Sequence, residues 1–155
     1  MMKKPWLVIL IVAVVLVGFL YIKYRVAPKL QFQTLQLTDL NGNAVKLQDY
    51  QGKKIFLNFF QTWCGPCINE LPDLDNTAAS LLPDNFIFLG ISDESLPVLN
   101  RLQLRLKLHH VILLHSVQKL KQINMYTYPT SYLLNAKGQV VLDKPGEEYW
   151  SVPET

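Results

Sequence analysis

Two cysteines, Cys64 and Cys67, are the residues of this chain best suited to covalent chemistry. They lie three positions apart and are the only cysteines in the sequence. A disulfide framework that holds a small secreted domain together would need more cysteines, spread further along the chain. A bridge between such close residues closes a very small loop and removes little entropy from the unfolded chain. We therefore expect the pair to have a chemical purpose.

The segments on either side of the pair predict a buried strand followed by a helix. Ile55–Phe60 is an almost continuous apolar run, which is typical of a strand covered on both faces. After the cysteines, leucines recur at helical spacing as far as Pro83, and Pro72 is expected to kink this helix. The cysteines would thus lie at a helix N-terminus, where unpaired N–H groups and partial positive charge favour a thiolate.

This position predicts different roles for the two sulfurs. Cys64 is nearer the helix end, so we expect it to have the lower pKa and to act as the nucleophile. Cys67, one turn further on, is placed to resolve a mixed disulfide. Pro66 suits the first turn, where its missing N–H costs little. Trp63 would shield the sulfurs and offer an apolar rim.

The rest of the chain alternates strands with helices, which predicts an α/β fold with a mainly parallel sheet that is covered on both faces and ends in a hairpin. A hairpin is expected first, with strands Phe32–Thr38 and Ala44–Leu47 around a turn that contains Asn41-Gly42. The later elements are expected at Phe86–Ser92 (strand), Ser95–Lys107 (helix), Val111–Leu114 (strand), Ser116–Met125 (short helix), Thr130–Leu134 (strand) and Val140–Leu142 (strand).

The N-terminal segment from Pro5 to Ile22 carries no charge. About 20 apolar residues in a helix cross a hydrocarbon core of about 30 Å. A cleaved signal peptide would have a shorter apolar region and a small-residue cleavage site. We therefore expect a transmembrane anchor at 5–22, a basic tail at 1–4, a linker at 23–31 and one folded domain at 32–155. Basic residues flank both ends of the anchor, so charge does not set its orientation.

The formal net charge of +3 is small, and the basic residues are scattered along the chain. A nucleic-acid-binding protein would concentrate them on one face. The length of 155 residues fits one domain with an appendage.

Three separated segments resemble the TlpA/ResA family of membrane-anchored bacterial thioredoxin-like proteins. These segments read FQTLQLTDLNGNAVKLQDYQGK, LNFFQTWCGPCINELP and TYPTSYLLNAKGQVVLDKPG, and WCGPC is the active-site string of thioredoxins. The resemblance covers about Phe32 to Gly146. It implies a thioredoxin-like fold, in which a central mixed sheet is flanked by helices, with an N-terminal hairpin and one N-terminal transmembrane helix.

The resemblance also implies roles for single residues. Pro129 matches a proline held in cis, which would present the backbone of Tyr128 to an extended substrate segment. Asn58 stands where thioredoxins proper have a buried aspartate. Glu70, three residues after Cys67, matches a glutamate that would relay protons and raise the thiol pKa values. The chain departs from the family pattern in two places. Its C-terminal helix is expected to be very short or absent, and the segment Leu96–His115 has little likeness to the family and is a candidate for partner contact.

The implied activity is thiol–disulfide exchange, most often the reduction of extracytoplasmic proteins in cytochrome c maturation. The family suggests a membrane thiol transporter of the CcdA/DsbD kind as electron donor, and a domain outside the cytoplasm on the bacterial inner membrane. The Gly-Pro dipeptide is that of thioredoxin, whose potential of about −270 mV favours reduction. A disulfide-forming oxidant of the same fold stays open, and so does a non-catalytic tethered module that binds copper or a partner.

Metal binding would need further ligands besides the two thiolates. Zinc requires two more, which His109, His110 and His115 would have to supply. Two thiolates and one histidine could hold Cu(I), although copper-delivering relatives typically have three residues between the cysteines. We expect no metal and no cofactor, with the histidines in polar loops.

Overall fold

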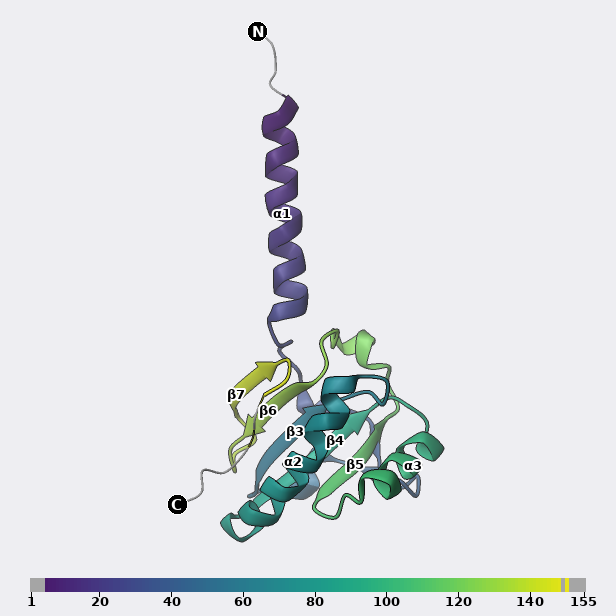
Figure 1. Cartoon of the computed structure of the whole chain (residues 1–155). Helices are drawn as coiled ribbons and strands as arrows, with labels where there is room; N and C mark the ends of the chain where they lie inside the picture. The colour runs from purple at the N-terminus through teal and green to yellow at the C-terminus, as the bar shows by residue number, and fades with distance from the viewer. Residues whose placement is uncertain (1–4, 149, 151–155) are drawn as a thin grey trace.

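The structure is a computed structural model that describes residues 5–148 and 150, and the statements below concern these residues. The expected tail at 1–4 lies outside them. Helix α1 (Pro5–Arg25) stands out from one end of the folded domain (Figure 1). Its window Trp6–Lys23 has a mean hydropathy of 2.7 and none of it is buried, so by length and composition it is able to cross a membrane.

The domain is built on one seven-stranded mixed sheet in the order β2-β1-β5-β4-β3-β6-β7. The central strands β3, β4 and β5 are parallel, and the other pairs are antiparallel. The mixed sheet implied by the resemblance is therefore confirmed, and its parallel part consists of these three strands. The strands are β1 (Leu37–Thr38), β2 (Ala44–Val45), β3 (Lys54–Phe59), β4 (Phe86–Ser92), β5 (Val111–Ser116), β6 (Thr130–Leu134) and β7 (Val140–Pro145).

Two helices connect the parallel strands and cover one face of the sheet. Helix α2 (Gly65–Leu81) joins β3 to β4, and α3 (Leu96–Leu106) joins β4 to β5. Successive right-handed crossovers that advance in one direction place their helices on the same face. Leucines of both helices accordingly share one buried cluster with the two cysteines. Helix α2 runs through Pro72, which lacks the N–H that would bond within the helix.

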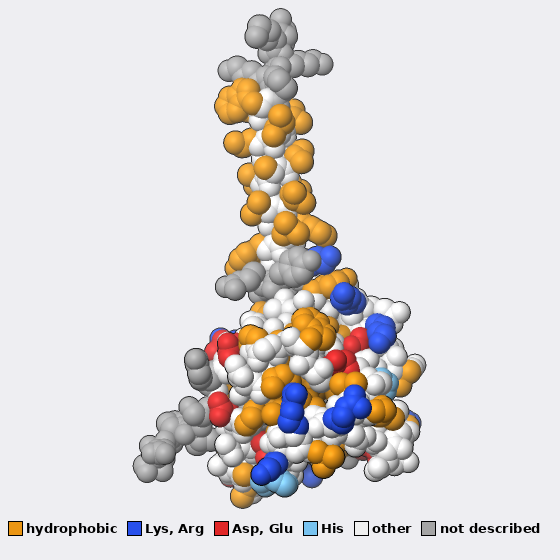
Figure 2. All heavy atoms as spheres, turned by 45° about the vertical axis from the view of Figure 1, so that its right-hand side comes forward, with side chains coloured by type: hydrophobic (Ala, Val, Ile, Leu, Met, Phe, Trp, Pro, Cys, Tyr) orange, Lys and Arg blue, Asp and Glu red, His pale blue; other side chains and the backbone are white. Residues whose placement is uncertain are grey.

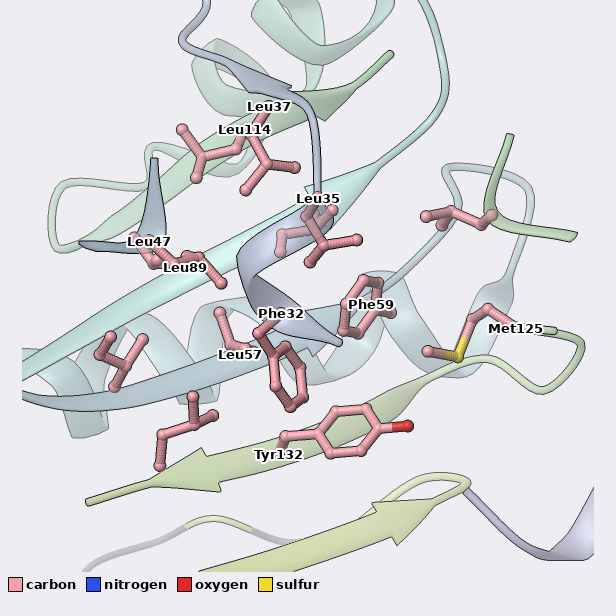
Figure 3. Close-up of a cluster of buried hydrophobic side chains, with 14 of the residues drawn as sticks. Phe32, Leu35, Leu37, Leu47, Leu57, Phe59, Leu89, Leu114, Met125 and Tyr132 are labelled. Carbon is pink, nitrogen blue, oxygen red and sulfur yellow. The ribbon is translucent and has the colours of Figure 1, made fainter. Parts of the chain in front are cut away.

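The opposite face is covered by irregular chain and short 3-10 turns. Phe32 and Leu35 of the N-terminal segment lie over Leu57 and Phe59 of β3 and Tyr132 of β6 (Figure 3). The turns are η1 (Phe32–Thr34), η2 (Leu47–Tyr50) and η4 (Leu120–Ile123), while η3 (Leu82–Asp84) follows α2.

Two expected elements differ from the structure. Phe32–Thr34 forms a 3-10 turn, so the first hairpin strand is confined to Leu37–Thr38. The expected short helix Ser116–Met125 is reduced to the single turn η4. Ser116 instead extends β5, where it is paired with Leu37 of β1. Burial of Phe32 in the core accompanies the first change, and pairing across the sheet outweighs the local pattern in the second.

The anchor joins the domain with almost no free chain between them. Ala27 already lies in the core at 7% exposure. The Tyr132 hydroxyl donates to the Pro28 carbonyl oxygen at 2.7 Å. The Lys23 ammonium lies 4.4 Å from the centre of the Tyr126 ring. Residues 23–31 are therefore divided between the end of α1 and the edge of the core.

Candidate functional site

Cys64 and Cys67 form a disulfide at the start of α2. Their Cα atoms are 5.3 Å apart and the S–S distance is 2.11 Å. Cys64 is the N-cap residue, and its sulfur accepts from the Cys67 backbone N–H at 3.3 Å. Cys64 is 7% exposed and Cys67 is 1% exposed. A thiolate at Cys64 would therefore lie at the outer position, with helix N–H groups to stabilise its charge.

An exposed aromatic rim lies beside the pair. Trp63 is 71% exposed, and its ring meets that of Tyr128 edge-on, with centroids 5.9 Å apart. Tyr128 also packs against the cluster that contains both cysteines. The Tyr128–Pro129 peptide bond is cis, as the resemblance implies, and β6 begins at the next residue. The structure thus brings together all the residues expected to contact a substrate.

Behind Cys67 lies a buried polar group centred on Glu70, which is 4% exposed and so more buried than the sequence suggests. The Asn58 amide donates to the Ser131 hydroxyl at 3.0 Å and, weakly, to Glu70 Oε1 at 3.4 Å. The Trp150 indole N–H also donates to Glu70 Oε1. Asn58 belongs to β3, Ser131 to β6 and Glu70 to α2, so this polar group joins the sheet to the helix behind the redox pair.

This setting raises the pKa of Glu70 to about 7. Burial is the main cause, the Trp150 hydrogen bond opposes it, and the nearby carboxylates of Glu147, Glu148 and Asp73 add to it. Glu70 Oε2 and the Asn58 carbonyl oxygen are both buried without a partner among the described residues. A proton on Glu70 Oε2 would turn one of these unpartnered acceptors into a donor. The carboxyl group is therefore suited to take up and release a proton near neutral pH.

Trp150 was not anticipated from the sequence. Its backbone carbonyl accepts from the Thr77 hydroxyl at 2.6 Å, and its ring meets Phe56 edge-on at 4.8 Å between centroids. In the described residues after β7 there is no helix, and Trp150 packs against the buried cluster that α2 and α3 share. A single tryptophan near the end of the chain gives no periodic signal that would predict this contact.

The histidines lie in other contacts. His109 and His110 donate backbone N–H groups to the Asp75 carboxylate at 2.7 to 3.1 Å, and His110 Nδ1 lies 3.3 Å from it. His115 lies in strand β5 and not in the loop expected from the sequence, and its Nδ1 is 2.8 Å from the Glu94 carbonyl oxygen. Within residues 5–148 and 150 there is no group of three or more His, Cys, Asp or Glu that could hold a metal ion.

Comparison with known proteins agrees with this geometry. Residues 27–142 match the model of the AhpC/TSA family. The chain is 29% identical over 114 residues to thiol-disulfide oxidoreductase ResA of Bacillus thuringiensis subsp. konkukian, covering 72% of this chain and 66% of the relative. It is 30% identical over 150 residues to thioredoxin-like protein YneN of Bacillus subtilis, covering 90% and 88%. The first curated ResA relatives are thus matched over 60 to 66% of their own length.

Solved structures share the fold. The exposed lipoprotein thioredoxin Etrx1 of Streptococcus pneumoniae superposes with a TM-score of 0.63 and 26% sequence identity, over 73% of this chain and 89% of that one. A thiol:disulfide interchange protein of the DsbE type from Chlorobium tepidum gives a TM-score of 0.63 at 23% identity, over 73% and 81%. The thioredoxin-like fold expected from the sequence is confirmed.

Proposed function

Because the chain belongs to the AhpC/TSA family of thioredoxin-like proteins, we propose that it is a ResA-type thiol–disulfide oxidoreductase that reduces disulfides in other proteins. The observation that carries the proposal is the Cys64–Cys67 disulfide at the N-terminus of α2, with the outer sulfur beside an exposed aromatic rim. A bridge that served only stability would not need this position.

The proposed reaction begins with both cysteines reduced. The Cys64 thiolate attacks one sulfur of the substrate disulfide, forms a mixed disulfide and displaces a substrate thiolate. Cys67 then attacks the Cys64 sulfur, which forms the Cys64–Cys67 bond and releases the second substrate sulfur. The substrate gains the electron pair that the two cysteines lose. Before its attack Cys67 must give up a proton, and the buried Glu70 carboxylate is the proposed acceptor.

The proposed substrate contacts are Trp63, Tyr128 and Pro129. Trp63 offers a large exposed ring next to Cys64, and Tyr128 packs against the cysteine cluster. An extended segment of the substrate would lie across these residues while its disulfide reaches Cys64. This contact would hold the reacting sulfurs in line during exchange.

The proposed setting is the bacterial inner membrane, with a single span at residues 5–22 and the domain on the extracytoplasmic side. The apolar and unburied α1 supports this placement. A membrane thiol transporter of the CcdA/DsbD kind would return electrons to the pair, and apocytochrome c is the proposed substrate. Protease accessibility of the domain in intact and in opened spheroplasts tests the orientation.

The covalent intermediate provides the decisive experiment. In Cys67→Ser the mixed disulfide forms but is not resolved, so a peptide disulfide becomes attached to Cys64 and is detected by mass spectrometry. Cys64→Ser gives no adduct if Cys64 is the attacking sulfur. Adducts in neither variant would refute the function. Equilibration of the parent with glutathione separates a reductant from a disulfide-forming oxidant, since an oxidant would have a potential near −120 mV.

A further inference from the structure

The small net charge of this chain conceals a strong asymmetry along the sequence. Residues 95–142 contain six Lys or Arg and no Asp or Glu, whereas the rest of the chain contains nine basic and twelve acidic residues. This acid-free stretch includes α3 and the segment between β5 and β6. One continuous stretch of the chain is therefore cationic, and the rest of the chain has a slight excess of acidic residues.

The fold brings the cationic stretch to the redox pair. A hollow of about 510 Å³ is lined by Trp63 and Tyr128 together with Lys119, Lys121, Val98, Asp93 and Glu94. The hollow thus includes Trp63, the residue that precedes Cys64. A peptide that presents a disulfide to Cys64 would have this hollow open to its flanking residues.

A second hollow of about 440 Å³ continues the first along α3. It is lined by Arg101, Arg105 and Thr62, and Val98 belongs to both hollows. In Figure 2, where the α3 side of the domain comes forward, Lys and Arg side chains stand among exposed apolar ones. Together the two hollows form a basic groove, defined by Arg101, Arg105, Lys119 and Lys121, that leads to the redox pair.

The cations of this groove are not neutralised within the described part of the chain. Arg101, Arg105 and Lys121 form no ion pair there. Lys119 donates to the backbone carbonyl oxygen of Asp93 at 3.2 Å, a contact that leaves its charge in place. Both arginines and both lysines are exposed.

Two carboxylates, Asp93 and Glu94, border the groove, and each accepts hydrogen bonds from loops of the protein itself. Asp93 accepts from the Gln61 amide at 2.7 Å and from the Leu120 backbone N–H at 3.0 Å. Glu94 accepts from the Thr62 hydroxyl at 2.7 Å. The hollow beside Trp63 thus has two lysines and two carboxylates, and the excess positive charge of the groove comes from Arg101 and Arg105 in the second hollow. The groove is then complementary to an anionic segment.

We propose that the basic groove selects protein substrates whose target disulfide is flanked by acidic residues. This inference rests on the proposed reductase function and names its substrate class. Acidic residues beside the disulfide would lie over Lys119 and Lys121 and extend toward Arg101 and Arg105. Exposed charges act mainly by steering the encounter, so the effect belongs in the second-order rate constant and weakens with salt.

The test compares three synthetic peptides with the same internal disulfide, flanked on both sides by Glu, Gln or Lys residues. The full chain, reduced and held in a non-ionic detergent, reacts with each peptide in a single turnover. We expect the Glu peptide to react roughly tenfold faster than the Lys peptide at low salt, and the difference to shrink severalfold in 0.5 M NaCl. Equal rates for the three peptides overturn the inference.

Paired variants locate the effect. Arg101→Gln with Lys121→Gln removes one unpaired cation from each hollow, and we expect it to lower the Glu-over-Lys preference about threefold or more. The control, Lys53→Gln with Lys137→Gln, removes the same charge from a different pocket, which is lined by Phe32 and Tyr50. This control should keep the preference for the Glu peptide over the Lys peptide. An equal loss in the control would assign the preference to net charge and overturn the groove.

Two further measurements separate the explanations. Hydroxyethyl disulfide is small and uncharged, so its reduction reports on the thiol chemistry alone. A parent protein that does not reduce it refutes the proposed function, whereas one that reduces it without any peptide preference refutes only the substrate class. The second measurement tests whether vesicles of phosphatidylglycerol bind the domain of the parent and of the Arg101/Lys121 variant. Binding by the parent alone, together with equal rates for the three peptides, would make the groove a lipid site, and the inference would fail.

Discussion

Trp150→Phe isolates the contribution of one hydrogen bond to the acidity of Glu70. In the structure the indole N–H donates to Glu70 Oε1, and the ring packs against Phe56. Phenylalanine keeps an aromatic ring at this place but has no donor. The hydrogen bond favours the charged carboxylate, so its loss should raise the pKa of Glu70 above its value of about 7.

The magnitude follows from the charge of the acceptor. A hydrogen bond to a charged group contributes about 1.5–3 kcal/mol, and about 1.4 kcal/mol corresponds to one pH unit. The titration midpoint of Glu70 should therefore move up by about one to two pH units. Carbon-detected NMR of the side-chain carboxyl groups in the oxidised protein measures it, and the signal that disappears in Glu70→Gln identifies the residue.

Trp6→Phe is the matched control, because Trp6 lies in α1 and is 58% exposed. This variant should leave the Glu70 midpoint in place. A midpoint in Trp150→Phe that stays where it is, or that falls, would refute the argument, since it would mean that water entering beside the smaller ring matters more than the lost donor.

The remaining predictions concern stability. Glu70→Gln removes a carboxyl group whose folded pKa of about 7 exceeds its ordinary 4.5, so the folded parent is penalised increasingly as pH rises through this interval. In urea unfolding the variant should match the parent at pH 4 and exceed it by about 3 kcal/mol at pH 8, and equal stability at both would contradict the buried position. Asp75→Asn replaces a carboxylate by a neutral amide. Burial raises the pKa of Asp75, but hydrogen bonds from Val111, His110 and His109 outweigh this effect and lower the pKa. The variant should lose about 2 kcal/mol at pH 7, and this difference should narrow only as pH falls below the ordinary pKa of 3.8, where the carboxylate of the parent is protonated as well. Gly90→Ala places a methyl group 2.8 Å from Leu113 Cδ2 in β5 and should cost about 1–3 kcal/mol in thermal unfolding, whereas an unchanged midpoint would show that the sheet can yield here.

Elements with a strong local pattern could be predicted from the sequence. The strand Phe86–Ser92 agrees with its expected bounds, and α3 agrees within one residue at each end. Elements that depend on distant partners could not. Ser116 belongs to β5 because Leu37 is paired with it from the other end of the domain, and no local pattern contains that information.

The same division applies to the candidate site. The cysteines, Trp63 and Glu70 all lie between positions 63 and 70, at or just before the start of α2, so spacing alone brings them together. The protonation of Glu70 depends on Trp150, which lies 80 positions further along. Burial of that carboxyl group is a property of the assembled core, which a motif does not encode.

The short junction between α1 and the core restricts where the redox pair can act. Only Val26 lies between the end of α1 and the buried Ala27, and one residue of extended chain spans about 3.5 Å. With α1 in a bilayer, as proposed, the domain would diffuse laterally and keep nearly one height above the lipid. Partners anchored in the same bilayer would meet it at a high effective concentration, and a disulfide carried far from the surface would stay out of reach.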